Sequence, residues 1–305
     1  MSRRYGVYQV DAFTTQRFAG NPAGVVPDAA GLSEAEMLAI ARELNNSETA
    51  FVLPAEHDDH DVRVRFFTPT TEVPICGHAT IAAHWIRAHE GAPQGITRQR
   101  TGAGILPVEI EIDVDGRRRI WMTQAPALFA PAIEGEARDA LLAALGIGPD
   151  AVADYGPIQV VSTGHSKVLI PLRSRAALDG LKPDLKALVR LSSQFECNGY
   201  YPFTLASPAP GFLSHGRMFA PAIGIPEDPV TGNASGPLGA YLLEHGHIEL
   251  DSVGKFTFEA CQGEAMGRQG SVTVEVTRSD AADAIQVRIA GEAVIVFRTE
   301  IELNA

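Results

Sequence analysis

An internal repeat constrains the fold of this chain more than any other feature of its sequence. Tyr5–Val10 is echoed 150 positions later by Tyr155–Val160, Arg65–Pro69 is echoed 152 positions later by Arg217–Pro221, and Gly77–Ala79 is echoed 155 positions later by Gly232–Ala234. The echoes keep their order, and an apolar helix rich in Ala or Gly follows the third one in both halves. The repeat therefore predicts two similar α+β halves.

Two like halves predict a cleft between them, with one glycine-led helix start from each half facing it. The stretch Gln124–Pro131 is rich in Pro and Ala and lacks periodicity, so we place the junction within residues 124–154. We expect an N-terminal lobe of residues 1–128 and a C-terminal lobe of residues 129–305, with the last C-terminal strand able to pack back on the first lobe.

Hydrophobic periodicity and turn residues indicate further elements in both halves. Ser33 and Glu36 have the spacing of a capping box, which predicts a helix that ends near Asn45. Asp115-Gly116 is a hairpin signal between two alternating segments. The expected strands cover residues 5–13, 25–26, 49–53, 61–66, 105–114 and 117–122, and further strands are expected at 271–276, 285–289 and 293–297; a second helix is expected at 136–145.

Composition and charge exclude several classes of function. The chain has 305 residues, is 45% hydrophobic, and carries a formal net charge of -12, which argues against nucleic-acid or anionic-membrane partners because both require clustered Lys and Arg. The start lacks the apolar segment of a signal peptide, and no window has the length of a membrane span. We expect a cytoplasmic protein. The three cysteines lack C-x-x-C spacing, so neither a disulfide framework nor a structural zinc site is predicted.

The two glycine-led helix starts, Gly77-His78 and Gly232-Asn233, are candidate anion sites. Backbone amides at a helix start have no intrahelical partner and lie at the positive end of the helix dipole. Neither loop carries the P-loop or the dinucleotide-binding glycine pattern. A small carboxylate-bearing ligand therefore fits better than a nucleotide, although the glycines also suit tight strand-to-helix turns.

Cys76 lies just before the first of these helix starts. A thiolate is favoured there, so Cys76 is a candidate nucleophile or base, and the alternative is a small buried side chain. The matching residue of the second half is Thr231. The repeat therefore excludes a symmetrical pair of catalytic thiols.

Three further side chains are candidates for chemistry. Glu48 joins the first helix to the next strand, and a carboxylate directed into an apolar cleft suits proton transfer near neutral pH. The alternative is an exposed glutamate at the end of the helix. His78 is a candidate to orient the substrate or to shuttle a proton, and the alternative is a ring that bonds the backbone. Asp228 precedes Pro229 in a segment three residues longer than its counterpart in the first half, and we assign Glu227 and Asp228 to the extra residues. The cluster His57–Asp61 is typical of a solvated loop, so no metal site is predicted.

Several motifs in register make the chain resemble the phenazine-biosynthesis PhzF-like family, in particular its uncharacterised YddE branch. These motifs are Gly20-Asn21-Pro22, Asn46-Ser47-Glu48-Thr49, Pro74–Thr80, Thr163–Lys167 and Glu227–Asn233. The resemblance runs almost from end to end. It implies the diaminopimelate-epimerase-like fold, in which each lobe is a mostly antiparallel sheet curled around a central helix, and an active site between the lobes that uses no cofactor, usually in a homodimer.

The resemblance also implies roles for individual residues. Glu48 matches the glutamate that moves a proton between carbons of a dihydro-hydroxyanthranilate in the phenazine enzyme. The positions that contact its substrate correspond to Ser47, Gly77, His78, Asp228 and Gly232, with Asn233 where that enzyme has serine. Cys76 replaces an alanine of that enzyme.

The prediction is a cofactor-independent isomerase that moves a proton on a small carboxylate-bearing substrate, with Glu48 as its acid and base. Related racemases and hydroxyproline dehydratases use Cys before Gly-His, so a Cys76-dependent epimerase or dehydratase of a hydroxy- or amino acid is the first alternative. A protein that binds a small acid without converting it is the second. No metal, nucleic acid or membrane partner is expected, and a homodimer is possible.

Overall fold

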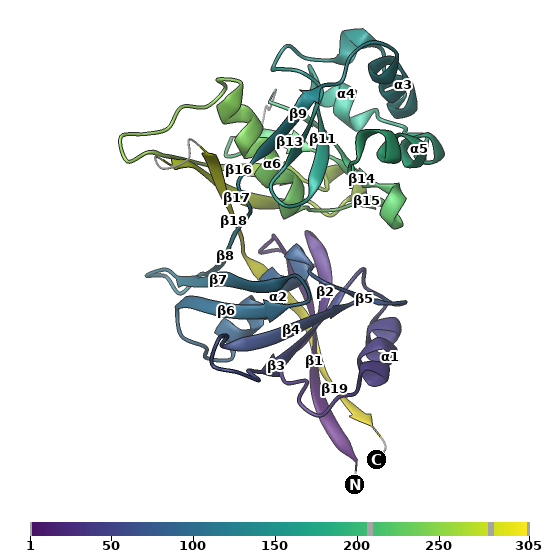
Figure 1. Cartoon of the computed structure of the whole chain (residues 1–305). Helices are drawn as coiled ribbons and strands as arrows, with labels where there is room; N and C mark the ends of the chain where they lie inside the picture. The colour runs from purple at the N-terminus through teal and green to yellow at the C-terminus, as the bar shows by residue number, and fades with distance from the viewer. Residues whose placement is uncertain (1, 206–209, 280–283, 304–305) are drawn as a thin grey trace. The chain divides into compact units, whose positions relative to one another are not determined.

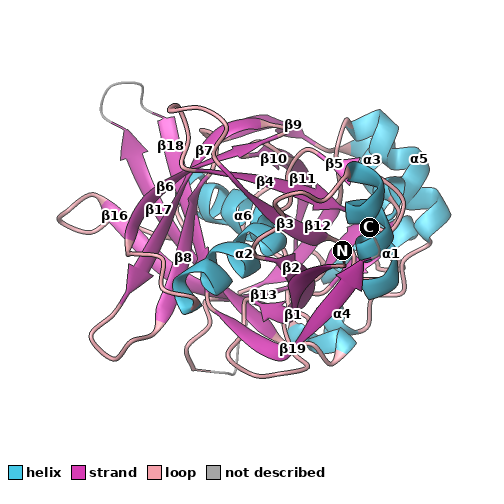
Figure 2. Cartoon of the chain, turned by 90° about the horizontal axis from the view of Figure 1, so that it is seen from below, coloured by secondary structure: helices cyan, strands magenta, loops and turns pink. Residues whose placement is uncertain are grey.

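The structure is a computed structural model that describes residues 2–205, 210–279 and 284–303. The chain divides into two compact units, one made of Met1–Thr123 with Ala290–Ala305 and the other of Gln124–Ile289 (Figure 1). Strands outnumber helices in both units (Figure 2). Most of the strand pairs among the described residues are antiparallel. The predicted α+β class is confirmed.

One continuous sheet forms the first unit. Its neighbouring strands run in the order β19, β1, β2, β3, β4, β6, β7 and β8; the β2–β3 and β4–β6 pairs are parallel and the others antiparallel. The elements of this unit are β1 (Arg3–Ala12), β2 (Asn21–Val26), α1 (Glu34–Leu44), β3 (Thr49–Pro54), β4 (Val62–Phe67), β5 (Glu72–Val73), α2 (Gly77–His89), β6 (Gly95–Thr101), β7 (Gly104–Ile112), β8 (Arg118–Thr123) and β19 (Ala293–Leu303).

The second unit is built around a second series of paired strands, in the order β9, β10, β11, β12, β13, β16 and β17. Its elements are β9 (Leu128–Ala132), α3 (Gly135–Leu145), η1 (Pro149–Ala151), β10 (Gln159–Ser162), β11 (Ser166–Pro171), α4 (Arg175–Asp179), α5 (Leu185–Phe195), β12 (Tyr200–Thr204), β13 (Ser214–Gly216), β14 (Met218–Ala220), η2 (Pro221–Ile223), β15 (Ile225–Asp228), α6 (Gly232–Glu244), β16 (Lys255–Gln262), η3 (Glu264–Met266), β17 (Gly270–Ser279) and β18 (Ala284–Gly291). Helices α3 and α5 lie side by side (Figures 1 and 2).

A buried helix lies within the strands of each unit. Helix α2 packs against β1, β2, β3, β7 and β8, and α6 packs against β10, β11 and β17. Both helices have 13 residues, and both follow an extended residue whose side chain makes no capping hydrogen bond: Cys76 before α2 and Thr231 before α6. The two helices thus begin and end at positions that the repeat matches.

The repeat extends to an ion pair in each unit. Arg65 contacts Glu72 at 2.6 Å and its guanidinium lies 5.0 Å from the Phe67 ring. In the second unit Arg217 contacts Glu227 at 2.8 Å, and its guanidinium lies 5.0 Å from the ring of Phe219.

This match corrects one expectation. Strand β15 pairs with β14 as β5 pairs with β4, so Glu227 corresponds to Glu72 and Asp228 to the next residue, Val73. Our assignment of Glu227 and Asp228 to the extra residues was wrong. The turn between β14 and β15, which contains η2, accommodates the extra length.

Helix α1 shows the predicted capping box. Ser33 accepts a hydrogen bond from the Glu36 amide, and Glu36 accepts one from the Ser33 amide at 2.8 Å. Asn45 ends the helix in the left-handed conformation. This cap fixes the start of the helix that leads to Glu48.

We expect Ser33→Ala to lower the free energy of unfolding by about 1 kcal/mol, because one amide at the helix start loses its partner. Urea unfolding measures the change. Ser193→Ala is the matched control: Ser193 is exposed in the interior of α5, where alanine favours the helix. Equal changes in the two variants would contradict the prediction.

Candidate functional site

The loop that carries Ser47 and Glu48 is held from two directions. After α1 ends at Asn45, the Asn46 side chain exchanges two hydrogen bonds of 2.9 Å with Gln9 of β1. The Glu48 carbonyl accepts a hydrogen bond from the Gly24 amide at 3.3 Å, and β3 begins at the next residue. Glu48 is therefore fixed between two paired strands, with its side chain 14% exposed.

Four predicted residues of the first unit form one group at the start of α2. His78 Nε2 lies 3.3 Å from Ser47 Oγ and 3.5 Å from Glu48 Oε2, while His78 Nδ1 lies 3.4 Å from Cys76 Sγ. A single neutral tautomer suits these contacts: Nε2–H faces the carboxylate, and Nδ1 accepts from the thiol. The imidazole thus connects Glu48 with Cys76.

The helix start adds free amides to this group. The Cys76 carbonyl accepts the Thr80 amide at 3.0 Å and the Thr80 hydroxyl at 2.7 Å. Gly77 and His78 are the first two helical residues, so their amides have no intrahelical acceptor. The arrangement combines a carboxylate, an imidazole and the positive end of a helix dipole.

The remaining predicted residues, Asp228, Gly232 and Asn233, form a second group at the start of α6. The Thr231 carbonyl accepts from the Ser235 amide at 3.1 Å and from its hydroxyl at 3.3 Å, which repeats the Thr80 contacts in the first unit. The Thr231 hydroxyl donates to Asp228 Oδ2. Asp228 is thus tied to the residue that precedes α6.

Two glutamines, both missed by the sequence analysis, support this second group. Gln262 donates to the Asp228 carbonyl at 2.7 Å and to Thr231 Oγ1 at 3.2 Å, and it accepts from the Thr231 amide at 3.1 Å. Because Gln262 lies at the end of β16 and is separated from Asp228 by 34 positions, no local pattern indicated its role.

Gln124 holds the first turn of α6. Its Nε2 donates to the Gly232 carbonyl at 3.2 Å and to Asn233 Oδ1 at 3.1 Å, while its Oε1 accepts from the Thr163 hydroxyl at 2.7 Å. Thr163 begins the motif Thr163–Lys167, which the family resemblance had indicated without a role. The motif therefore supports the start of α6.

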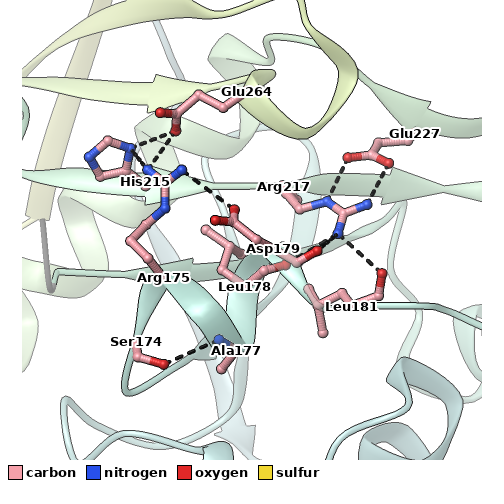
Figure 3. A network of polar contacts seen from close by, with 10 residues as sticks. All are labelled: Ser174, Arg175, Ala177, Leu178, Asp179, Leu181, His215, Arg217, Glu227 and Glu264. Atoms are coloured by element: carbon pink, nitrogen blue, oxygen red, sulfur yellow. Dashed lines mark hydrogen bonds and ion pairs between the residues drawn. The ribbon is translucent and has the colours of Figure 1, made fainter.

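An arginine network holds the strand that carries Asp228 (Figure 3). Arg217 makes hydrogen bonds of 2.8 and 2.9 Å to the two carboxylate oxygens of Glu227. The same guanidinium donates to the carbonyls of Leu178 and Leu181, each at 3.2 Å. Glu227 immediately precedes Asp228, so this paired contact fixes the approach to the second group.

Two sets of described residues have the donor atoms and spacing of a metal site: Glu48, Cys76 and His78 in the first unit, and His215, Cys261 and Glu264 in the second. In the second set the Arg175 guanidinium contacts both His215 and Glu264 (Figure 3). Arg175 therefore already supplies positive charge at the place where a metal ion would bind to this set. The first set, with a thiol, an imidazole and a carboxylate, has ligand types that zinc accepts.

The His215 and Arg175 contacts govern the ionisation of Glu264. Burial alone raises the pKa of this carboxyl, but hydrogen bonds from His215 and Arg175 outweigh burial and lower the pKa from 4.5 to about 2. A carboxyl whose pKa is lowered by folding stabilises the fold above its unfolded pKa. That stabilisation is lost as the pH falls from about 4.5 toward 2.

Glu264→Gln is expected to lower stability at neutral pH and to weaken the loss of stability between about pH 4.5 and 2. Urea unfolding at a series of pH values measures both effects. Glu249→Gln, at an exposed position, is the control and should keep the pH dependence of the unsubstituted protein. An unchanged acid profile in Glu264→Gln would contradict the assignment.

Comparison with known proteins identifies the family of this chain. The family model described as phenazine biosynthesis-like protein matches residues 10–299. The chain belongs to this family. An uncharacterised isomerase of Clostridium acetobutylicum is 52% identical over 305 residues, which cover 100% of both chains. The uncharacterised isomerase YddE of Escherichia coli (strain K12) is 50% identical over 96% of this chain and 97% of its own.

Two further relatives define the wider family. The trans-2,3-dihydro-3-hydroxyanthranilate isomerase of Pseudomonas aeruginosa is 35% identical, over 85% of this chain and 86% of its own. The crystal structure of a Bacillus anthracis phenazine biosynthesis protein of the PhzF family is 33% identical, with a TM-score of 0.88 over 99% of this chain and 100% of that one. The predicted family, its fold and the isomerase class are confirmed.

Among the described helices, none has both the length and the apolar character needed to cross a bilayer.

Proposed function

We propose that the protein isomerises a small carboxylate-bearing substrate by moving a proton between two of its carbons, with Glu48 as the single acid and base. The observation that carries this proposal is the environment of Glu48. Its largely buried carboxylate lies 3.5 Å from His78 Nε2, at the start of α2. A carboxylate held beside an imidazole and free amides is suited to receive a proton and return it.

The proposed reaction leaves the number of atoms and electrons in the substrate unchanged. Glu48 removes a proton from one carbon, and the electron pair of the broken C–H bond shifts into the adjacent unsaturated system. Glu48 then returns the proton to a second carbon, where a new C–H bond forms. The step has no net oxidation or reduction, so it needs no electron acceptor.

The remaining site residues are proposed to bind the substrate. Ser47, Gly77 and His78 are assigned to it in the first unit, and Asp228, Gly232 and Asn233 in the second. Free amides at the starts of α2 and α6 suit carboxylate oxygens. Asp228 suits a hydroxyl or amino group, because it is a hydrogen-bond acceptor tied in place by Thr231.

The Pseudomonas aeruginosa relative suggests the first compound to assay, trans-2,3-dihydro-3-hydroxyanthranilate. The protein is incubated with it in deuterium oxide, and mass spectrometry and NMR follow carbon-bound deuterium and the position of the double bonds. The proposal expects an isomerised product. Recovery of chemically unchanged substrate without carbon-bound deuterium, from this compound and from related dihydro-acids, would instead favour a binding protein.

One contact favours the alternative of a Cys76-dependent epimerase or dehydratase. Cys76 Sγ lies 3.4 Å from His78 Nδ1, so the imidazole could also accept a proton from the thiol. The same deuterium assay, applied to Glu48 and Cys76 variants, separates the two mechanisms.

A further inference from the structure

Lys167 of β11 lies on the face of the strand that α6 covers. Its neighbour Val168 belongs to the hydrophobic cluster that contains residues of α3 and α5, and successive side chains of a strand point to opposite faces. In the ladder with β10, Lys167 is paired with Val161 and Leu169 with Gln159. The Gln159 side chain bonds His245, the residue that follows α6, at 3.0 Å.

The motif Thr163–Lys167 is linked to the N-terminal end of α6 at two points. The ammonium interacts electrostatically with Asp228, which lies four residues before the helix. From the other end of the motif, Thr163 is linked through Gln124 to the Gly232 carbonyl. The motif Thr163–Lys167 therefore contributes two side chains to the surroundings of this helix start.

The ammonium is deeply buried and sparsely bonded. Lys167 is 3% exposed. Of its three N–H donors, one makes a hydrogen bond, to the Ser166 carbonyl at 3.4 Å. Across residues 2–205, 210–279 and 284–303, the ammonium has no other hydrogen-bond acceptor and no carboxylate oxygen within 4.0 Å. Buried lysines are ordinarily paired, so this one offers donors to a ligand.

Anionic oxygen is the chemistry that matches these donors. The Asp228 carboxylate already accepts from the Thr231 hydroxyl. The amides of Gly232 and Asn233, first in a helix of 13 residues, have no intrahelical acceptor by position and add the positive end of the helix dipole. A buried ammonium and a helix start together favour a carboxylate over a neutral group.

We infer that Lys167 is a substrate-binding residue whose ammonium donates to a carboxylate oxygen of the substrate and makes the site select an acid over the corresponding amide. The inference rests on the proposed function, which requires a carboxylate-bearing substrate. The inference adds Lys167 to the substrate-binding residues, a role that we had not assigned to it from the sequence motifs or from the contacts around Glu48.

The test compares two unreactive probes, 2-aminobenzoate and its neutral amide 2-aminobenzamide, by calorimetric titration. The unsubstituted protein is expected to bind the acid more tightly. Lys167→Met, which keeps most of the side chain's length and removes the charge, should weaken binding of the acid about 10- to 100-fold and leave the amide nearly unchanged. Lys167→Arg should recover part of the affinity for the acid.

Two controls separate binding from folding and from the proposed function. Lys186→Met, at an exposed position on α5, should bind both probes as the unsubstituted protein does, and thermal unfolding verifies that Lys167→Met is folded. Equal losses for the acid and the amide would overturn the inference and make Lys167 a counter-charge to Asp228. An unsubstituted protein that binds neither probe would overturn the proposed substrate class as well.

The pH dependence provides a second readout. Burial lowers the pKa of Lys167 to about 8, against opposing effects of Cys197 and Asp228. Burial also lowers the pKa of the neighbouring His165 and raises that of the Cys197 thiol, so neither is expected to gain or lose charge strongly above neutral pH. Affinity for 2-aminobenzoate should therefore fall as the pH rises through about 8, and this fall should be absent in Lys167→Met.

Discussion

Glu48→Gln is expected to slow carbon-bound deuterium incorporation about 10²- to 10⁴-fold, the usual effect of removing a positioned acid and base. Glutamine keeps the size of the side chain and a hydrogen bond acceptor for His78 Nε2, so the fold and the imidazole should be retained. The rate is measured by mass spectrometry with trans-2,3-dihydro-3-hydroxyanthranilate in deuterium oxide. We expect much slower deuterium incorporation and an unchanged midpoint of thermal unfolding.

Two matched variants make this result specific. Glu43→Gln removes an exposed carboxylate from α1, five residues before Glu48, and should exchange at the unsubstituted rate. Cys76→Ala removes the thiol that lies 3.4 Å from His78 and should retain most of the activity. If Cys76→Ala were inactive and Glu48→Gln active, the Cys76-dependent mechanism would replace the one proposed.

Gly263→Ala is expected to be the most destabilising single substitution considered for the second unit. Gly263 has a φ of +87°, and an added Cβ would overlap the Arg268 carbonyl oxygen and lie 2.8 Å from that of Pro229. Left-handed backbone strain and overpacking together predict a loss of about 2–5 kcal/mol in the free energy of unfolding. Because both contacts are with backbone, the strain cannot be relieved by rotating a side chain.

The substitution should also affect the start of α6, since the preceding residue, Gln262, bonds both Thr231 and Asp228. Urea unfolding measures stability, and the deuterium assay measures the site. Gly267→Ala is the control, because Gly267 has a φ of +65° but no atom within 4 Å of an added Cβ. Its free energy of unfolding should fall by about 1–2 kcal/mol, from backbone strain alone. Similar losses in both variants would rule out the predicted steric contact.

The sequence predicted the helices at the centre of each unit because the repeat marks both of them. Gly77 and Gly232 begin helices of equal length, and their positions could be matched without structural information. Helix α1 was predicted because its capping box is local. Strand β6 and helix α5 were not among the expected elements, although Asp184 caps α5 by accepting from two amides. Both lie outside the segments that the repeat had matched.

The partners of the site residues could not be predicted in the same way. Gln262 reaches Asp228 across 34 positions and Gln124 reaches Gly232 across 108, distances at which sequence pattern carries no information about contact. The burial of Lys167 depends on α6, which packs against β11 in the structure, and no sequence pattern indicated that contact. The correspondence between Glu227 and Glu72 required the strand pairing, because three extra residues hide it in the sequence.

Strand β19 has a consequence for the order in which the protein forms. The ladder between β1 and β19 pairs Arg3 with Leu303, so the sheet of the first unit joins residues from the two ends of the chain. During synthesis, Gln124–Ile289 is made before β19. Most of the second unit can therefore form its contacts first, while β1 keeps an open edge until β19 pairs with it. A chain that is interrupted before β19 would therefore leave this edge of β1 unpaired.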